Sequence, residues 1–186
     1  MSIRSIVAGA LIAAAALQPS PGVAVPSAPQ LIDQTGRSFT LNSLHGHPLI
    51  VTFISAHCTD ACPLVNAQFS DAAAQLARRH LSTRLLTITL DPANDPPSLM
   101  RALAERFDAN PRYWLLASGR PGDVDAIVNA FGVIARLGKS GYREQHTTFV
   151  YVLNPAGKLE RTMLASTGLT GDILDAARAM QSRTSK

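Results

Sequence analysis

A nearly continuous apolar segment runs into a pair of cysteines at residues 48–63, PLIVTFISAHCTDACP. Its first part, Pro48 to Ile54, is short and rich in β-branched residues, which is typical of a strand buried on both faces. After the second cysteine, apolar residues recur with the period of a helix, at Val65, Phe69, Ala72, Ala73 and Leu76. We therefore expect the cysteines at the junction between a central strand and a helix.

Segments of strand and helix character alternate along the rest of the chain. Residues 30–41 have the alternation of a hairpin, with a turn at Asp33-Gln34-Thr35-Gly36. Further strands are predicted at 85–90, 113–117, 147–153 and 158–163, and helices at 97–107, 121–131 and 170–180. Strands that alternate with helices predict an α/β sheet with helices on both faces.

The composition is that of one soluble globular domain with an N-terminal extension. Of the 186 residues, 46% are hydrophobic and 16% are charged, which excludes a coiled coil, a collagen-like repeat and a polar disordered tract. The net charge is +4. Because the basic residues are scattered rather than clustered with aromatic ones, no nucleic-acid-binding surface is predicted.

The N-terminus has the layout of a secretory signal peptide. Arg4 precedes the apolar run from Ile6 to Leu17, and Gly22-Val23-Ala24 offers small residues before a cleavage point. As a helix, that run spans about 18 Å, against about 30 Å of membrane hydrocarbon. We therefore expect a signal peptide at 1–24, a linker at 25–29, one domain at 30–182 and a flexible tail at 183–186. The mature protein is expected to be periplasmic and soluble, with membrane anchoring as the alternative.

Cys58 and Cys62 are the two cysteines of the chain. A domain of this size does not need a disulfide to fold, so the pair points to chemistry; an inert disulfide is the alternative, although so short a loop would stabilise little. Residues four apart at a helix start lie about 6 Å apart, which allows a disulfide or a shared metal ion. The helix N-terminus favours thiolates, and two thiolates suit Cu(I), which accepts two or three ligands.

A third metal ligand would have to come from elsewhere in the chain. His45 and His47 precede the central strand, His57 adjoins Cys58, and His80 ends the following helix. His146 stands apart, in a segment that could close over the cysteine helix in a thioredoxin-like sheet. From spacing alone, His146 is either a ligand or an exposed or structural histidine.

The sequence resembles the Sco/SenC family, thioredoxin-fold copper proteins that help to assemble a copper site of cytochrome c oxidase. The resemblance covers nearly all of the mature chain and rests on motifs that agree in order and separation: LIDQTG at 31–36, CTDACP at 58–63, Leu90-Asp91-Pro92 followed by Asp95 and Pro97, Tyr113-Trp114 with Ser118-Gly119, FGV at 131–133, and His146 followed by YVLNPAG at 151–157. Thr59 departs from the family pattern, which usually has Pro there, and so does Gln145, where an Asp often precedes the His.

The resemblance implies a thioredoxin-like fold, with a central mixed sheet flanked by helices and an N-terminal β-hairpin. It implies that Cys58, Cys62 and His146 bind copper, that the two cysteines also form a redox-active pair, and that Asp91 lies near the site. For Asp91, the alternative is a turn residue before Pro92.

By the same resemblance, the protein would hold Cu(I) or Cu(II) as an assembly factor rather than as an enzyme. Its expected partners are a cytochrome c oxidase copper-site subunit or another periplasmic copper protein, and a thiol-disulfide reductant. The alternative function is a thiol-disulfide oxidoreductase that keeps a partner's cysteines reduced.

Overall fold

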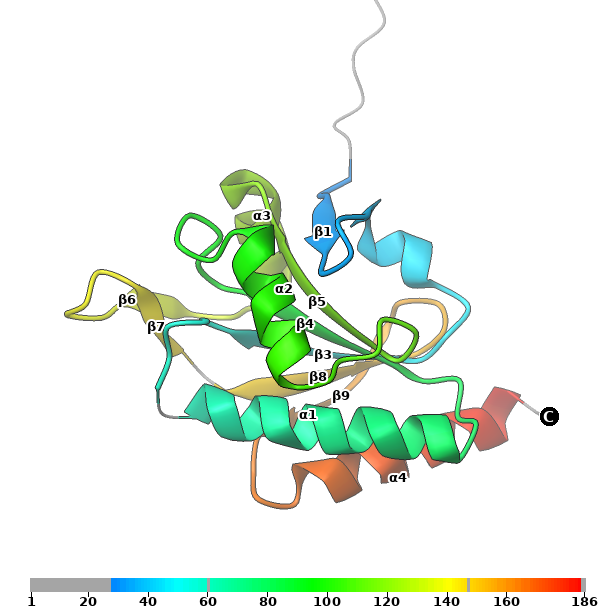
Figure 1. Cartoon of the computed structure of the whole chain (residues 1–186). Coiled ribbons are helices and arrows are strands. Elements are labelled where there is room, and N and C mark those ends of the chain that lie inside the picture. The colour runs from blue at the N-terminus through cyan, green and yellow to red at the C-terminus, as the bar shows by residue number, and fades with distance from the viewer. Residues whose placement is uncertain (1–27, 60, 147, 185–186) are drawn as a thin grey trace, which may run out of the picture.

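A mixed sheet of seven strands forms the centre of the part of the chain that the structure describes (Figure 1). The computed structural model describes residues 28–59, 61–146 and 148–184, with the backbone alone for 144–146 and 184. The strands of the sheet are β1 (Leu31–Asp33), β2 (Ser38–Phe39), β3 (Leu49–Ile54), β4 (Arg84–Thr89), β5 (Trp114–Gly119), β8 (Phe149–Leu153) and β9 (Leu159–Leu164). The helical elements are η1 (Leu41–Leu44), α1 (Ala61–Arg78), α2 (Pro97–Arg106), α3 (Pro121–Ala130) and α4 (Leu169–Thr184).

The strand order is β2-β1-β5-β4-β3-β8-β9. Strands β3, β4 and β5 are parallel, and their carboxyl ends lie at one edge of the sheet. Strand β1 joins β5 in antiparallel orientation, and β8 and β9 extend the other side in the same way. The thioredoxin-like mixed sheet and the N-terminal hairpin predicted from the sequence are therefore confirmed.

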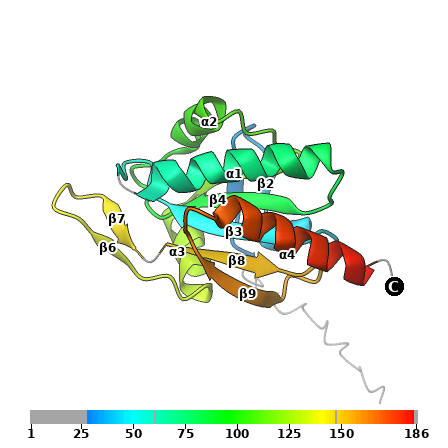
Figure 2. The same ribbon diagram turned by 90° about the horizontal axis from the view of Figure 1, so that it is seen from below.

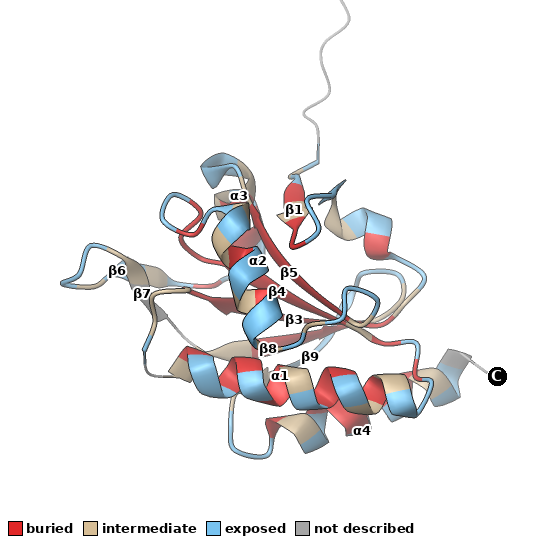
Figure 3. Ribbon diagram, in the orientation of Figure 1, coloured by how far each residue is buried: buried red, intermediate tan, exposed pale blue. Residues whose placement is uncertain are grey.

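Strand β3 is buried along its whole length, as its apolar sequence predicts (Figure 3). Successive side chains of a strand point to opposite faces, so β3 contributes to two cores. Ile50 and Ile54 pack on the face that is covered by α1, α2 and α4. Val51 and Phe53 pack on the face covered by α3, where Phe53 makes edge contacts with two other aromatic rings. Helices on both faces thus hold this strand, and the loop after it, in a rigid frame.

Two elements near the carboxyl edge are not predicted from the sequence. Strands β6 (Ala135–Leu137) and β7 (Arg143–His146) form a separate antiparallel hairpin, in a region for which the sequence predicts a loop. Figure 2 shows this hairpin extending from the body of the molecule near the first turn of α1. Strand β7 pairs with β6 and not with the buried sheet, so it needs no apolar face. Its polar sequence therefore gave no strand signal.

The chain ends differ in part from the expected domain boundaries. Helix α4 continues to Thr184, so the first two residues of the predicted tail at 183–186 are helical. The predicted signal peptide at 1–24 and most of the linker at 25–29 lie outside the described residues. Among the helices that the structure describes, none combines the length and the apolar character needed to cross a membrane.

The side chain of Gln34 extends the pairing between β1 and β5 beyond the end of β1. Its Nε2 donates to the carbonyl of Trp114 at 2.9 Å, and its Oε1 accepts from the backbone N–H of Leu116 at 3.0 Å. The amide thus replaces one peptide unit of a neighbouring strand. Because Gln34 is 6% exposed, water cannot easily take over these bonds.

We predict that Gln34→Ala lowers the free energy of unfolding by about 2–4 kcal/mol, because it leaves a buried carbonyl and a buried N–H without partners. Urea unfolding followed by tryptophan fluorescence measures this change. The control is Gln30→Ala, at an exposed position, which should shift stability by no more than about 0.5 kcal/mol. Equal small effects of the two substitutions would show that the Gln34 bonds contribute nothing.

Candidate metal centre

The two cysteines lie at the predicted strand-to-helix junction. Cys58 is in the thiol loop (residues 55–59), which follows β3, and Cys62 is the second residue of α1. Both are thiols, with Cys58 partly exposed and Cys62 buried. A hydrogen bond joins their side chains, so the two sulfur atoms are neighbours. The backbone N–H of Cys58 donates to the carbonyl of Ser55 at 3.1 Å, which closes the loop in a tight turn.

The environment of Cys62 differs from the one predicted. We expected the N-terminus of the helix to favour the thiolate, but burial raises the pKa of the Cys62 thiol to about 12. The hydrogen bond with Cys58 acts in the same direction, and a hydrogen bond from the Ser55 backbone opposes it. Desolvation therefore outweighs the helix N-terminus, because Cys62 is only 2% exposed. Cys62 is a protonated thiol at neutral pH unless a cation replaces its proton.

A fully buried carboxylate, that of Asp95, holds the thiol loop in place. Its Oδ2 accepts hydrogen bonds from the backbone N–H of Ala56 at 2.9 Å and from the hydroxyl of Thr89 at 2.6 Å. The hydroxyl of Ser118 donates to the Asp95 carbonyl at 2.7 Å. Burial raises the pKa of Asp95, although the bonds from Thr89 and Ala56 lower it. Asp95 thus links the carboxyl ends of β3, β4 and β5.

Asp91 lies at the same edge of the sheet and is buried. Its backbone N–H donates a hydrogen bond to the hydroxyl of Thr89, the last residue of β4. Its carboxylate oxygen Oδ2 accepts from the side chain of Asn94 at 2.8 Å and from the backbone N–H of Arg143 at 3.1 Å. Asp91 therefore joins the β4–α2 loop to the β6–β7 hairpin. This contact is more than the local turn role that the sequence left open.

The β6–β7 hairpin carries His146 as the last residue of β7, opposite Ala135 of β6. The side chain of His146 lies outside the described residues. On the same hairpin, the ring of Tyr142 stacks on the imidazole of His57, with 3.9 Å between ring centroids and 8° between planes. The hairpin is therefore in direct contact with the thiol loop.

The described side chains bring together the two thiols, but no group of three or more His, Cys, Asp or Glu among them is arranged to hold a metal ion. Of the other histidines, His45 packs against Gly157, and His47 and His80 border a pocket at the opposite end of the parallel strands. Sequence reasoning missed Tyr142. It included Asp95 in the motif that follows Leu90-Asp91-Pro92 but assigned it no role in the site.

Comparisons with known proteins agree on one family. The model of the SCO1/SenC family matches residues 19–181. A SCO2-like protein of Rickettsia typhi is 26% identical over 134 residues, which are 69% of this chain and 64% of the relative, so the match spans less than two thirds of that relative.

Solved structures give the same picture. Copper-bound ScoI of Bradyrhizobium japonicum has a TM-score of 0.68 and 25% identity, over 79% of this chain and 96% of that one. A putative electron transfer protein from Aquifex aeolicus has a TM-score of 0.73 and 22% identity, over 88% of this chain and 95% of that one.

We predict that Cys62 reacts with iodoacetamide only through a rare thiolate. Reduced Cys58→Ser loses the contribution of Cys58 to this shift but keeps burial, its largest cause, so the alkylation rate should still be rising with pH between 7 and 10, by up to about tenfold for each pH unit. Mass spectrometry over time gives the alkylation rate. The control is the same variant unfolded in urea, where Cys62 is an ordinary thiol and its alkylation rate should level off near pH 9. A plateau below pH 9 in the folded variant would contradict the burial argument.

Proposed function

This chain belongs to the SCO1/SenC family, and we propose that it is a copper-binding assembly factor that delivers copper to the copper site of a respiratory oxidase. The observation that carries the proposal is the pair of neighbouring thiols at the start of α1. Two thiolates form a soft ligand set that Cu(I) accepts with two or three donors, whereas structural Zn(II) requires four. The copper-bound state of the Bradyrhizobium ScoI structure supports the same choice of metal.

Cys58, Cys62 and His146 are the proposed ligands. The contact between the hairpin and the thiol loop supports the choice of His146, since it keeps the backbone of β7 near the loop that carries Cys58. The cation replaces the proton on the buried Cys62 thiol, so metal binding releases protons. Asp91 supports the site by holding the hairpin and does not itself bind the metal.

Copper leaves the protein by exchange of ligands with an acceptor. Cys58 is the more exposed of the two thiols, so an acceptor thiolate or imidazole can displace it first, while Cys62 still holds the ion. Transfer of Cu(I) in this way changes no oxidation state. The proposed acceptor is an oxidase copper-site subunit or another periplasmic copper protein, and a thiol-disulfide reductant keeps the cysteines ready for the next ion.

Copper binding is tested by anaerobic Cu(I) titration of the reduced protein against a competing chelator. We expect one equivalent to be retained by the native sequence. In Cys58→Ser, Cys62→Ser and His146→Ala, affinity should fall by more than about 100-fold, the upper range for loss of an outer-shell partner. The control is His80→Asn, at an exposed position where φ is 51°, a conformation that Asn tolerates.

A native protein that does not compete for Cu(I) would overturn the proposal. If that protein and His146→Ala both reduced a disulfide substrate at equal rates, the thiol-disulfide oxidoreductase would be the function instead.

Export is part of the proposal. We propose that residues 1–24 are removed as a signal peptide, that 25–29 form a linker, and that the mature protein is soluble in the periplasm. The run from Ile6 to Leu17 is too short for the hydrocarbon core, which supports cleavage over anchoring.

We expect intact-mass measurement of the protein from the soluble periplasmic fraction to show an N-terminus near Val25. A Met1 or Ser2 terminus on membrane-bound protein would contradict cleavage. The matched control is the protein expressed without the first 24 residues. It provides the reference mass of the mature chain, and it should stay in the cytoplasmic fraction.

A further inference from the structure

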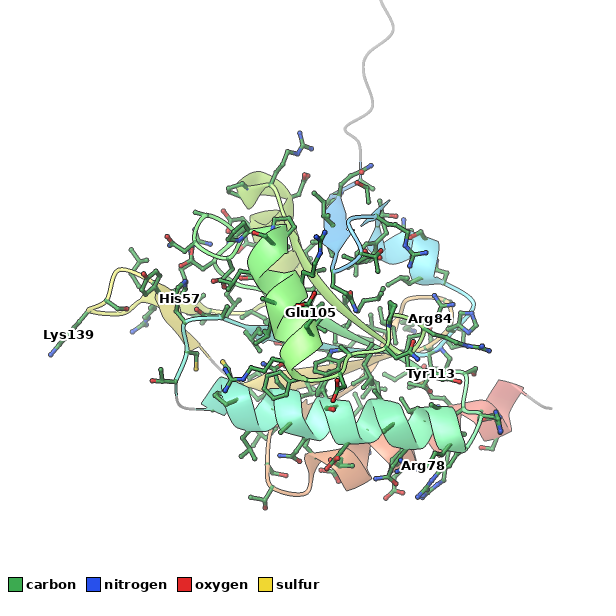
Figure 4. The ribbon with its side chains drawn as sticks, in the orientation of Figure 1. His57, Arg78, Arg84, Glu105, Tyr113 and Lys139 are labelled. Carbon is green, nitrogen blue, oxygen red and sulfur yellow. The ribbon has the colours of Figure 1, made fainter. Side chains whose placement is uncertain are left out.

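Two segments that carry proposed copper ligands are joined by an aromatic stack. His57 precedes Cys58 in the thiol loop, and Tyr142 precedes β7, the strand that ends at His146. Their rings are nearly parallel, at 8°, with centroids 3.9 Å apart. Figure 4 shows His57 beside the hairpin, whose outer tip carries Lys139.

At its edge, the His57 ring approaches the buried carboxylate of Asp95. The imidazole Nε2 lies 3.5 Å from Asp95 Oδ1, an oxygen that makes no hydrogen bond in the described structure. The second oxygen of the same carboxylate is fixed by Ala56 and Thr89. The position of the imidazole is therefore set by a group that is itself immobile.

The hairpin has a second attachment, next to the stack. The backbone N–H of Arg143 donates to Asp91 at 3.1 Å, and the Arg143 guanidinium pairs with Asp125 of α3. This attachment limits how far the hairpin can move, but it contacts the β4–α2 loop and α3, not the thiol loop. Among the contacts described, the stack is the one that ties the hairpin to the segment carrying Cys58.

We propose that His57 and Tyr142 form a latch, defined by their stacked rings, that positions His146 for the copper bound by Cys58 and Cys62. This inference rests on the proposed function. Tyr142 and His146 are separated by about 13 Å of extended strand, at about 3.3 Å per residue. Tyr142 is thus too far along the strand to share the ion with His146, and the His57 ring is engaged by Tyr142 and Asp95. Both rings are close enough to the hairpin to restrict where His146 can lie.

The physical effect of the latch is preorganisation. Without it, copper binding must also overcome the entropy of bringing the hairpin to the thiol loop, which weakens the complex. An aromatic pair contributes enough beyond simple burial to change affinity by about threefold to tenfold. His57 and Tyr142 are accordingly positioning residues, with an effect much smaller than the loss of a ligand.

The test is a double-mutant cycle on the full chain, with His57→Ala, Tyr142→Ala and the double variant. We expect each single variant to bind Cu(I) about threefold to tenfold more weakly and to release it faster, and the double variant to be no weaker than the singles. Tyr142→Phe keeps the ring and should restore native affinity. Lys139→Ala changes the exposed tip of the same hairpin without touching the stack and is the matched control.

Hydrogen–deuterium exchange of the metal-free protein provides a readout that does not depend on copper. The amides of residues 135–146 should exchange faster in His57→Ala and Tyr142→Ala than in the native protein, Tyr142→Phe and Lys139→Ala, with α1 unchanged. The latch would be overturned if exchange in His57→Ala and Tyr142→Ala were the same as in the native protein. It would also be overturned if the native protein bound Cu(I) and these variants bound it with the same affinity. If the native protein binds no copper, the proposed function fails, and the exchange rates alone decide whether the stack holds the hairpin.

Discussion

The site depends on one buried residue, Asp95, which links the carboxyl ends of the three parallel strands β3, β4 and β5. A single oxygen of its carboxylate accepts from the thiol loop and from the end of β4, and the backbone of the same residue binds β5. Burying a carboxylate is costly unless it is hydrogen-bonded, so its position is strongly constrained by these partners. The backbone of the thiol loop and the imidazole of His57 both contact this carboxylate.

This arrangement separates rigid from adjustable parts of the site. The thiols lie on a frame that two cores enclose, and the helix that carries Cys62 packs along its length against the sheet. The hairpin that carries His146 extends from the body of the molecule (Figure 2), with Ala135 packed against one core and with Tyr142 and Arg143 contacting the thiol loop, Asp91 and α3. The proposed carrier must hold an ion firmly and then release it, and two sulfurs on the frame with a third donor on a separate hairpin would meet both needs.

The sequence predicts those features that depend on neighbouring residues. The continuous apolar run of β3 and the helical period after Cys62 were sufficient to place the cysteines at a strand-to-helix junction. Asp95 could not be assigned in the same way, because its partners Ala56, Thr89 and Ser118 come from three separate segments. The state of the Cys62 thiol was predicted wrongly, since the helix N-terminus is visible in the sequence and the burial that outweighs it is not. Whether His146 is a ligand stays a prediction.

The central claim, that two sulfurs and one imidazole hold a single copper ion, is tested most directly by copper K-edge X-ray absorption of the Cu(I)-loaded protein. We expect a three-coordinate shell with two sulfur scatterers and one nitrogen, and loss of the nitrogen in His146→Ala. A native spectrum with sulfur ligands alone, unchanged by that substitution, would contradict the claim.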